Sequence, residues 1–168
     1  MPSKTSSLPA SSVEYRWGTV AEIRQQISTE YAVKQWEEAG IDKELVPLDI
    51  DYEKYDTLEK VGVYKAMIAW ADGTIVAYAG FIFGPNIHHR STPHALNLGI
   101  YVSPIYRGIG PRVVRAAERG FAQMVSPKVI RIIYEAPAGS RWRKTLHHLG
   151  YTEFGTVHQK VVRNGTIA

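Results

Sequence analysis

The sequence predicts a single mixed α/β domain with the element order β-α-α-β-β-β-α-β-α-β. Two apolar, β-rich runs flank an Asp-Gly pair at residues 72–73, the pattern of an antiparallel hairpin. Further along, a strand leads through a glycine turn into a helix and then another strand, and such a crossover joins parallel strands. A sheet that contains both connections must be mixed. A chain of 168 residues is long enough to bury one core without disulfides.

The N-terminal half is expected to contain one strand, two helices and the hairpin. Residues 13–18 form a short strand, and residues 19–38 have helical spacing with Thr19 as the candidate N-cap. Glycine and proline then interrupt the pattern, and residues 51–62 form a second short helix that ends at Gly62. The hairpin occupies residues 63–84, and a proline ends its second strand.

The C-terminal half is expected to alternate strands and helices. A strand over residues 94–104 is followed by a helix whose first turn accommodates Pro111. The buried stripe of this helix is Val114, Ala117, Phe121 and Met124. The remaining elements are a strand over 128–136, a helix over 140–150 with Ser140 as N-cap candidate, and a final strand over 151–163 with a kink at Gly155.

The composition limits the possible compartments and chemistries. The chain has no cysteine, which excludes disulfides, thiolate zinc sites and a cysteine nucleophile. Residues 1–12 are Ser-rich with two prolines, so we expect a flexible arm before a domain that spans 13–168. This arm lacks the apolar core of a signal peptide, and no apolar run approaches the roughly 20 residues of a membrane helix. We therefore expect an intracellular protein that does not enter a membrane.

The charge does not indicate a nucleic-acid partner. The formal net charge is +4, a modest excess, and the basic residues are spread along the chain. The one denser patch is SRWRK at residues 140–144, and the alternation of aromatic and basic residues typical of single-strand binders is missing. We therefore expect an ordinary soluble surface and no nucleic-acid partner.

Residues 101–110, YVSPIYRGIG, place a glycine turn between a strand and the start of a helix, where a phosphate can be held. With the element order, this stretch resembles the GNAT acyltransferase superfamily over about residues 13–163. The longer stretch FGPNIHHRSTPHALNLGIYVSPIYRG, residues 83–108, is similar to small GNAT proteins encoded by tailed bacteriophages. The resemblance implies helices on both faces of the sheet, acetyl-CoA as the acyl donor and a small-molecule or protein amine as the acceptor.

The resemblance also implies where acetyl-CoA would bind. In the family the fourth and fifth strands splay apart beside the pantetheine arm, and an R-x-x-G-x-(G or A) loop holds the pyrophosphate. The positions that match are Val102, Arg107, Gly108, Ile109, Gly110 and Arg112. Arg112 stands where the family has Gly or Ala, and the turn reads as two residues shorter than RGxGxG loops, so we expect a degenerate loop.

Arg112, Arg115 and Arg119 lie on one face of the helix that follows the loop. These arginines could add positive charge near the phosphates. The alternative is a solvated basic face opposite the buried stripe.

No catalytic residue is assigned. The family often has a carboxylate base on the fourth strand, where this chain has Asn97, Leu98 and Gly99. It often has a tyrosine proton donor on the last helix, where this chain has Leu146. The other candidate acids and bases are His88, His89, His94, His147, His148, Tyr134, Glu135 and Tyr151. A core or surface role is the alternative for each, and the histidine spacings do not match common metal-ligand pairs.

Two functions therefore remain open. The first is an acetyl-CoA-dependent N-acetyltransferase with altered loop and catalytic positions, acting in the cytoplasm of a host cell. The second is a non-catalytic virion or assembly component built on the same scaffold. In the second, the N-terminal arm would contact phage structural proteins.

Overall fold

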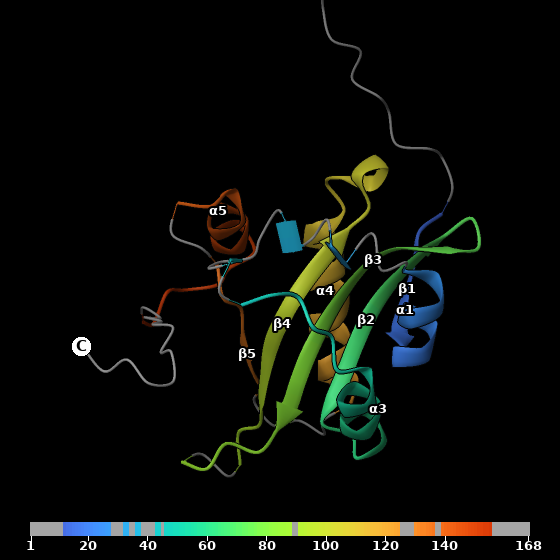
Figure 1. Cartoon of the computed structure of the whole chain (residues 1–168). Helices are drawn as coiled ribbons and strands as arrows, with labels where there is room; N and C mark the ends of the chain where they lie inside the picture. The colour runs from blue at the N-terminus through green and yellow to red at the C-terminus, as the bar shows by residue number, and fades with distance from the viewer. Residues whose placement is uncertain are drawn as a thin grey trace, which may run out of the picture.

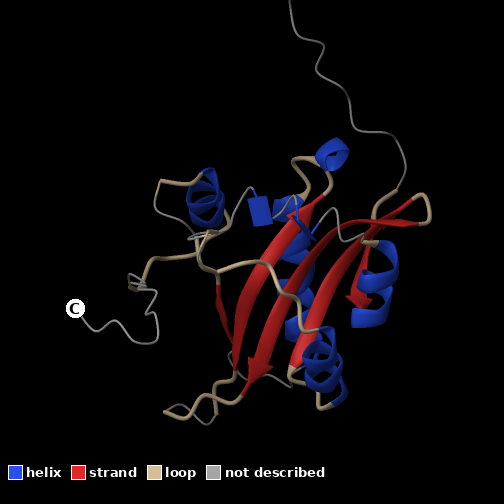
Figure 2. Ribbon diagram, in the orientation of Figure 1, coloured by secondary structure: helices blue, strands red, loops and turns tan. Residues whose placement is uncertain are grey.

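In the computed structural model, the described residues are 12–27, 32–33, 36–37, 43–44, 46–88, 91–124, 130–136 and 139–155. They form a five-stranded sheet in the order β1-β2-β3-β4-β5 (Figure 2). The strands are β1 (Glu14–Gly18), β2 (Tyr64–Ala71), β3 (Thr74–Gly84), β4 (His94–Val102) and β5 (Arg131–Ile133). Neighbours from β1 to β4 are antiparallel, whereas β4 and β5 are parallel. The predicted mixed sheet is confirmed.

Helices cover both faces of the sheet, as expected (Figure 1). Helices α1 (Val20–Gln26) and α3 (Tyr52–Lys60) lie on one face, and α4 (Gly110–Met124) lies on the other. Side chains of β2 alternate between these layers: Met67 and Ala69 join the α4 core, while Ala66 and Ile68 face the other side. A 3₁₀ turn, η1 (Pro104–Tyr106), and helix α5 (Arg141–His148) complete the described elements.

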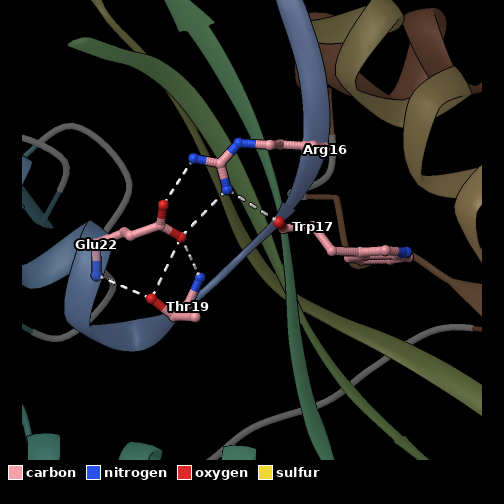
Figure 3. A network of polar contacts seen from close by, with 4 residues as sticks. All are labelled: Arg16, Trp17, Thr19 and Glu22. Atoms are coloured by element: carbon pink, nitrogen blue, oxygen red, sulfur yellow. Dashed lines mark hydrogen bonds and ion pairs between the residues drawn. The ribbon is translucent and has the colours of Figure 1, made fainter. Parts of the chain in front are cut away.

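The local signals in the sequence explain how several elements begin. Asp72 and Gly73 both have positive φ, 52° and 75°, which is the conformation of a type I′ hairpin turn. Thr19 is the N-cap of α1, and Glu22 reaches back to the Thr19 amide to complete a capping box (Figure 3). Ser140 caps α5 by accepting a hydrogen bond from the Arg143 amide. The hairpin and both predicted caps are confirmed.

Helix α4 is held on the sheet by aromatic contacts. Phe121 meets Trp17 of β1 edge to face at 5.0 Å and Phe81 of β3 at 5.2 Å, measured between ring centroids. The predicted stripe residues Val114, Ala117 and Phe121 are buried. The side chain of the fourth, Met124, lies outside the description. These contacts hold the C-terminal half of α4 against β1 and β3.

Some expected elements differ from the structure. Among the described residues the fifth strand pairs over Arg131–Ile133, and residues 134–136 form no strand, so the expected range 128–136 extends too far at its C-terminal end. Residues 128–129 of that prediction lie outside the description. Residues 151–155 form no strand, and the rest of the predicted final strand lies outside the described residues. The first predicted helix is described as α1 only to Gln26. All of the N-terminal arm except Ser12 lies outside the description.

Candidate functional site

Strand β4 has a β-bulge in its pairing with β3, just beyond the segment that pairs with β5. In the described part of the chain, β4 pairs with β5 from His94 to Leu96. On its other side, Gly99 pairs with Gly80 and Asn97 pairs with Phe81, so Leu98 is the extra residue. A bulge bends and twists its strand. Beyond it, β4 continues to Val102 with no described strand on the β5 side, and the two parallel strands diverge (Figure 2).

The side chain of Asn97 stabilises this bulge. It is 8% exposed, and its Nδ2 donates to the carbonyl oxygens of Gly80 at 3.0 Å and Gly99 at 3.1 Å. The amide therefore satisfies carbonyl groups on both strands where the ladder is irregular. From the sequence alone, Asn97 is identified only as a residue that cannot act as a base. The signal for its structural role was a polar residue inside an apolar strand, two positions before a glycine.

Two backbone amides remain unpartnered where the strand joins α4. The backbone N–H of Ile109 donates a hydrogen bond to the carbonyl oxygen of Tyr106 at 3.3 Å. The backbone N–H of Arg112 donates one to the carbonyl oxygen of Ile109 at 2.8 Å. In the described part of the chain, no hydrogen bond is donated by the N–H groups of Gly108 or Gly110. Gly108 has φ 106°, a conformation that favours glycine. These two donors lie at the positive end of α4, where an anion is stabilised.

The expectation of a shortened turn was wrong. Residues 107–112, RGIGPR, fill the six positions of RGxGxG one for one. The loop differs from the family pattern in the number of backbone N–H groups that it leaves free. Pro111 has no N–H group, and the amide of Arg112 is already bonded to Ile109. The loop has full length but presents only two unpartnered amides among residues 107–112.

Four elements meet at the open end of the diverging strands. A Cβ built on Gly110 would lie 3.5 Å from Trp142 Cζ3 and 3.8 Å from Val102 Cγ2. The Trp142 ring also meets Tyr134, which follows β5, at 6.3 Å between centroids. The structure thus brings together Val102 and Gly110, two residues that the sequence indicated. It adds Trp142, which in the sequence is visible only as part of the basic patch at residues 140–144.

The other loop residues differ in their exposure. Ile109 is 1% exposed and belongs to the α4 core, so its side chain anchors the loop. Arg107 is exposed at the end of η1, and Arg112 is exposed in the first turn of α4. The role of these residues in binding stays a prediction.

The described histidines do not converge on the loop. His94 begins β4, at the opposite end from the loop, and its Nδ1 lies 3.1 Å from Asn86 Nδ2. His88 is exposed after β3, and His147 and His148 are exposed in the last turn of α5. His89 lies outside the described residues. Within the described ranges, no group of three potential metal ligands occurs.

The remaining acid and base candidates lie in different surroundings. Leu146, at the family's tyrosine position, is 7% exposed and part of the core. Burial raises the pKa of Tyr134 and of Tyr151, so both keep their protons at neutral pH. Tyr151 Oη donates to Glu118 Oε1 at 2.9 Å, and the Tyr134 ring packs on Phe81. Glu135 is exposed.

Comparison with known proteins identifies the family. The sequence profile of the Acetyltransferase (GNAT) family matches residues 24–134, which include β2, β3, β4, the loop and α4. The chain belongs to the GNAT acetyltransferase family. Members of this family use acetyl-CoA as acyl donor, in agreement with the expectation from the sequence. No curated protein sequence matches the chain.

Solved structures share the fold at low sequence identity. A GCN5-related N-acetyltransferase from Ralstonia eutropha JMP134 has a TM-score of 0.70 and 18% identity, with 89% of this chain and 99% of that chain covered. A predicted acetyltransferase from Clostridium acetobutylicum, solved with acetyl-CoA, has a TM-score of 0.62 and 17% identity, covering 89% and 96%.

An aminoglycoside acetyltransferase from an uncultured soil metagenomic sample was solved with sisomicin. Its TM-score is 0.66 and its identity 14%, covering 90% of this chain and 97% of that chain.

Among the helices that the structure describes, none is long and apolar enough to cross a lipid bilayer. The narrower resemblance to phage proteins, with a virion location and phage structural partners, stays a prediction.

Proposed function

We propose that this chain is an acetyl-CoA-dependent N-acetyltransferase whose acyl donor lies between β4 and β5 with its pyrophosphate at the start of α4. The observation that carries the proposal is the pair of unpartnered amides, Gly108 and Gly110, next to the end of β4, where the described part of β5 no longer pairs with it. Free N–H groups at a helix N-terminus are unfavourable when they stay buried without hydrogen-bond partners. A bound anion would accept hydrogen bonds from them.

The residues present fit acetyl-CoA in three respects. Beyond the bulge the described part of β5 does not pair with β4, so the backbone of Val102 can exchange hydrogen bonds with an amide of a pantetheine arm. Gly108 and Gly110 donate to the pyrophosphate, and the exposed Arg107 and Arg112 add positive charge beside it. Ile109, buried in the core, holds the turn in place. When bound, acetyl-CoA supplies the thioester that is the acyl source.

The acceptor amine must be neutral to attack a thioester. Residues 97–102 of β4, NLGIYV, contain no carboxylate or imidazole, and the amide of Asn97 is used in the bulge. We therefore infer that the acceptor arrives already deprotonated from solvent. The rate should then rise with pH and level off at the pKa of the acceptor itself, and different acceptors should give different midpoints.

The test is acetyl transfer to a panel of amines, measured as thiol release together with the mass of the product. Because one matched structure holds sisomicin, aminoglycosides belong in the panel beside small primary amines and peptides with a free N-terminus. The variant Gly110→Pro removes one of the two amides, and proline is well tolerated at the first helical position. Arg131→Gln, an exposed arginine on β5, is the matched control.

We expect product with the native chain and with Arg131→Gln, and much less with Gly110→Pro. Binding of acetyl-CoA without any acetylated product would favour the non-catalytic alternative. Absence of both binding and product would contradict the proposed function altogether.

A further inference from the structure

A pocket on the exposed side of α4 extends beyond the loop and shares only Arg112 with the residues that have a role in the proposed function. Its volume is about 330 Å³, and the described residues that line it are Tyr15, Pro111, Arg112, Arg115, Arg119 and Leu149. The three arginines are spaced three and four residues apart, so they occupy one face of the helix. Tyr15 belongs to β1, which is separated from β4 by two strands of the sheet.

Tyr15 is the residue of β1 that lines this pocket. Its ring packs against the α4 core, and its Oη is buried without a completed hydrogen bond in the described structure. Burial raises the pKa of Tyr15, and the nearby guanidinium groups of Arg112 and Arg119 oppose that rise. Two cations two helical turns apart therefore lie near the same buried hydroxyl. On a helix face that is simply solvated, arginines would not lie beside a shared buried hydroxyl group.

The positive charge of the pocket is only partly balanced. Arg115 pairs with Glu118 at 3.4 Å, and Glu118 also accepts the Tyr151 hydroxyl at 2.9 Å. Among the described residues, no carboxylate lies within ion-pair distance of Arg112 or Arg119. Like charges in close proximity repel one another, and a multiply charged anion would relieve that repulsion.

We propose that the pocket formed by Tyr15, Arg112, Arg115 and Arg119 binds a phosphate monoester. A phosphate monoester carries close to two negative charges at neutral pH and three strongly accepting oxygens. Guanidinium groups match such oxygens in geometry and charge, and a tyrosine hydroxyl supplies a further donor. A single carboxylate would leave more of the positive charge uncompensated.

Two molecules could supply this group. The pocket begins at Pro111 and Arg112, next to the loop, and extends along α4 to Arg119. The 3′-phosphate of a coenzyme A bound at the loop is one source. A phosphate group of a separate ligand is the other.

The first arm of the test uses inorganic phosphate and does not depend on the proposed function. Phosphate is titrated at constant ionic strength into the native chain, Arg119→Gln, Tyr15→Phe and the control Arg131→Gln, with thermal unfolding confirming that each folds. We expect saturable binding to the native chain and to Arg131→Gln. Loss of one charged donor should weaken binding about 10-fold in Arg119→Gln and by a smaller factor in Tyr15→Phe.

The second arm compares acetyl-CoA with its 3′-dephospho form. If coenzyme A is the source, the native chain should bind the dephospho form about 10-fold more weakly, and Arg119→Gln should lose this difference. Equal binding of both forms, with phosphate still saturating the pocket, would assign the site to a separate ligand. The proposal is overturned if phosphate does not saturate and the two acyl donors bind alike, or if Arg131→Gln weakens phosphate binding as much as Arg119→Gln.

Discussion

At the scale of single residues, Asn97 has the clearest structural role at the candidate site. Its Nδ2 serves the carbonyl oxygens of Gly80 and Gly99 at the bulge that turns β4 away from β5. A carboxylate base at this position could not donate these hydrogen bonds when ionised. Asn97 therefore stabilises the bulge in β4 with a side chain that cannot act as a general base.

Replacing Asn97 with alanine should destabilise the protein. The change leaves two carbonyl groups without a donor at a buried site, so we expect a loss of about 1–3 kcal/mol in the free energy of unfolding. Leu98→Ala, at the neighbouring bulge position, is the control, because the Leu98 side chain is 47% exposed and should contribute far less. Equal losses in urea denaturation of the two variants would contradict this role for Asn97.

Glu22 is the residue whose titration reports on the start of α1. The hydrogen bond from Arg16, followed by that from the Thr19 backbone, lowers the pKa of Glu22 to about 2 from its ordinary value of 4.5 (Figure 3). A carboxyl with a lowered folded-state pKa adds stability above pH 4.5, and this contribution is lost as the pH falls toward 2. Because both side chains are partly exposed, solvent screening keeps the energetic effect small.

We expect an NMR titration to show Glu22 ionising well below its ordinary range in the native chain. Arg16→Gln removes the largest cause and should move the midpoint upward. Arg24→Gln, on the same helix but outside this network, should leave it in place. A Glu22 midpoint near 4.5 in the native chain would show that the network does not persist in solution.

At the scale of elements, α4 shows that packing can reverse an intrinsic preference. Alanine normally stabilises a helix interior relative to glycine by about 1 kcal/mol. At Gly120, however, an added Cβ would lie 2.7 Å from Trp17 Cζ2, on a ring that also packs against Phe121. The close approach of β1 and α4 therefore depends on this glycine.

Gly120→Ala should accordingly lower the free energy of unfolding by about 1–3 kcal/mol, as overpacked cores do. Gly84→Ala, where an added Cβ meets nothing within 4 Å, should change it by less than about 0.5 kcal/mol. Thermal or urea unfolding of both variants measures the difference. Stabilisation by Gly120→Ala would mean that helix propensity outweighs the contact with Trp17.

The order and limits of these elements follow largely from local signals in the sequence. The Asp72-Gly73 turn, the Thr19 and Ser140 caps and Pro111 at the start of α4 each act within a few residues, so their patterns can be read directly. The short β5 could not be predicted in this way. Its length depends on the bulge at Leu98 in another strand, which residues 128–136 do not encode.

At the scale of the whole molecule, the candidate site forms where four elements meet. The sequence indicated Val102 and Gly110 through their resemblance to the family loop, and the structure brings them together. The sequence did not indicate Trp142, because the contact between α5 and the start of α4 depends on the whole fold. The number of unpartnered amides also depends on hydrogen bonds between residues 106, 109 and 112, which spacing alone does not show.

The central claim is that acetyl-CoA binds between β4 and β5 on the amides of Gly108 and Gly110. The most direct test is calorimetric titration of acetyl-CoA into the native chain and Gly110→Pro, each at low and high salt, with unfolding curves confirming both folds. One charge-assisted hydrogen bond corresponds to about a 10- to 100-fold change in affinity. We predict one site per chain, binding that weakens with salt because of the exposed Arg107 and Arg112, and a loss of at least about 10-fold in Gly110→Pro. No binding at low salt, or equal affinity in the two proteins, would contradict the account.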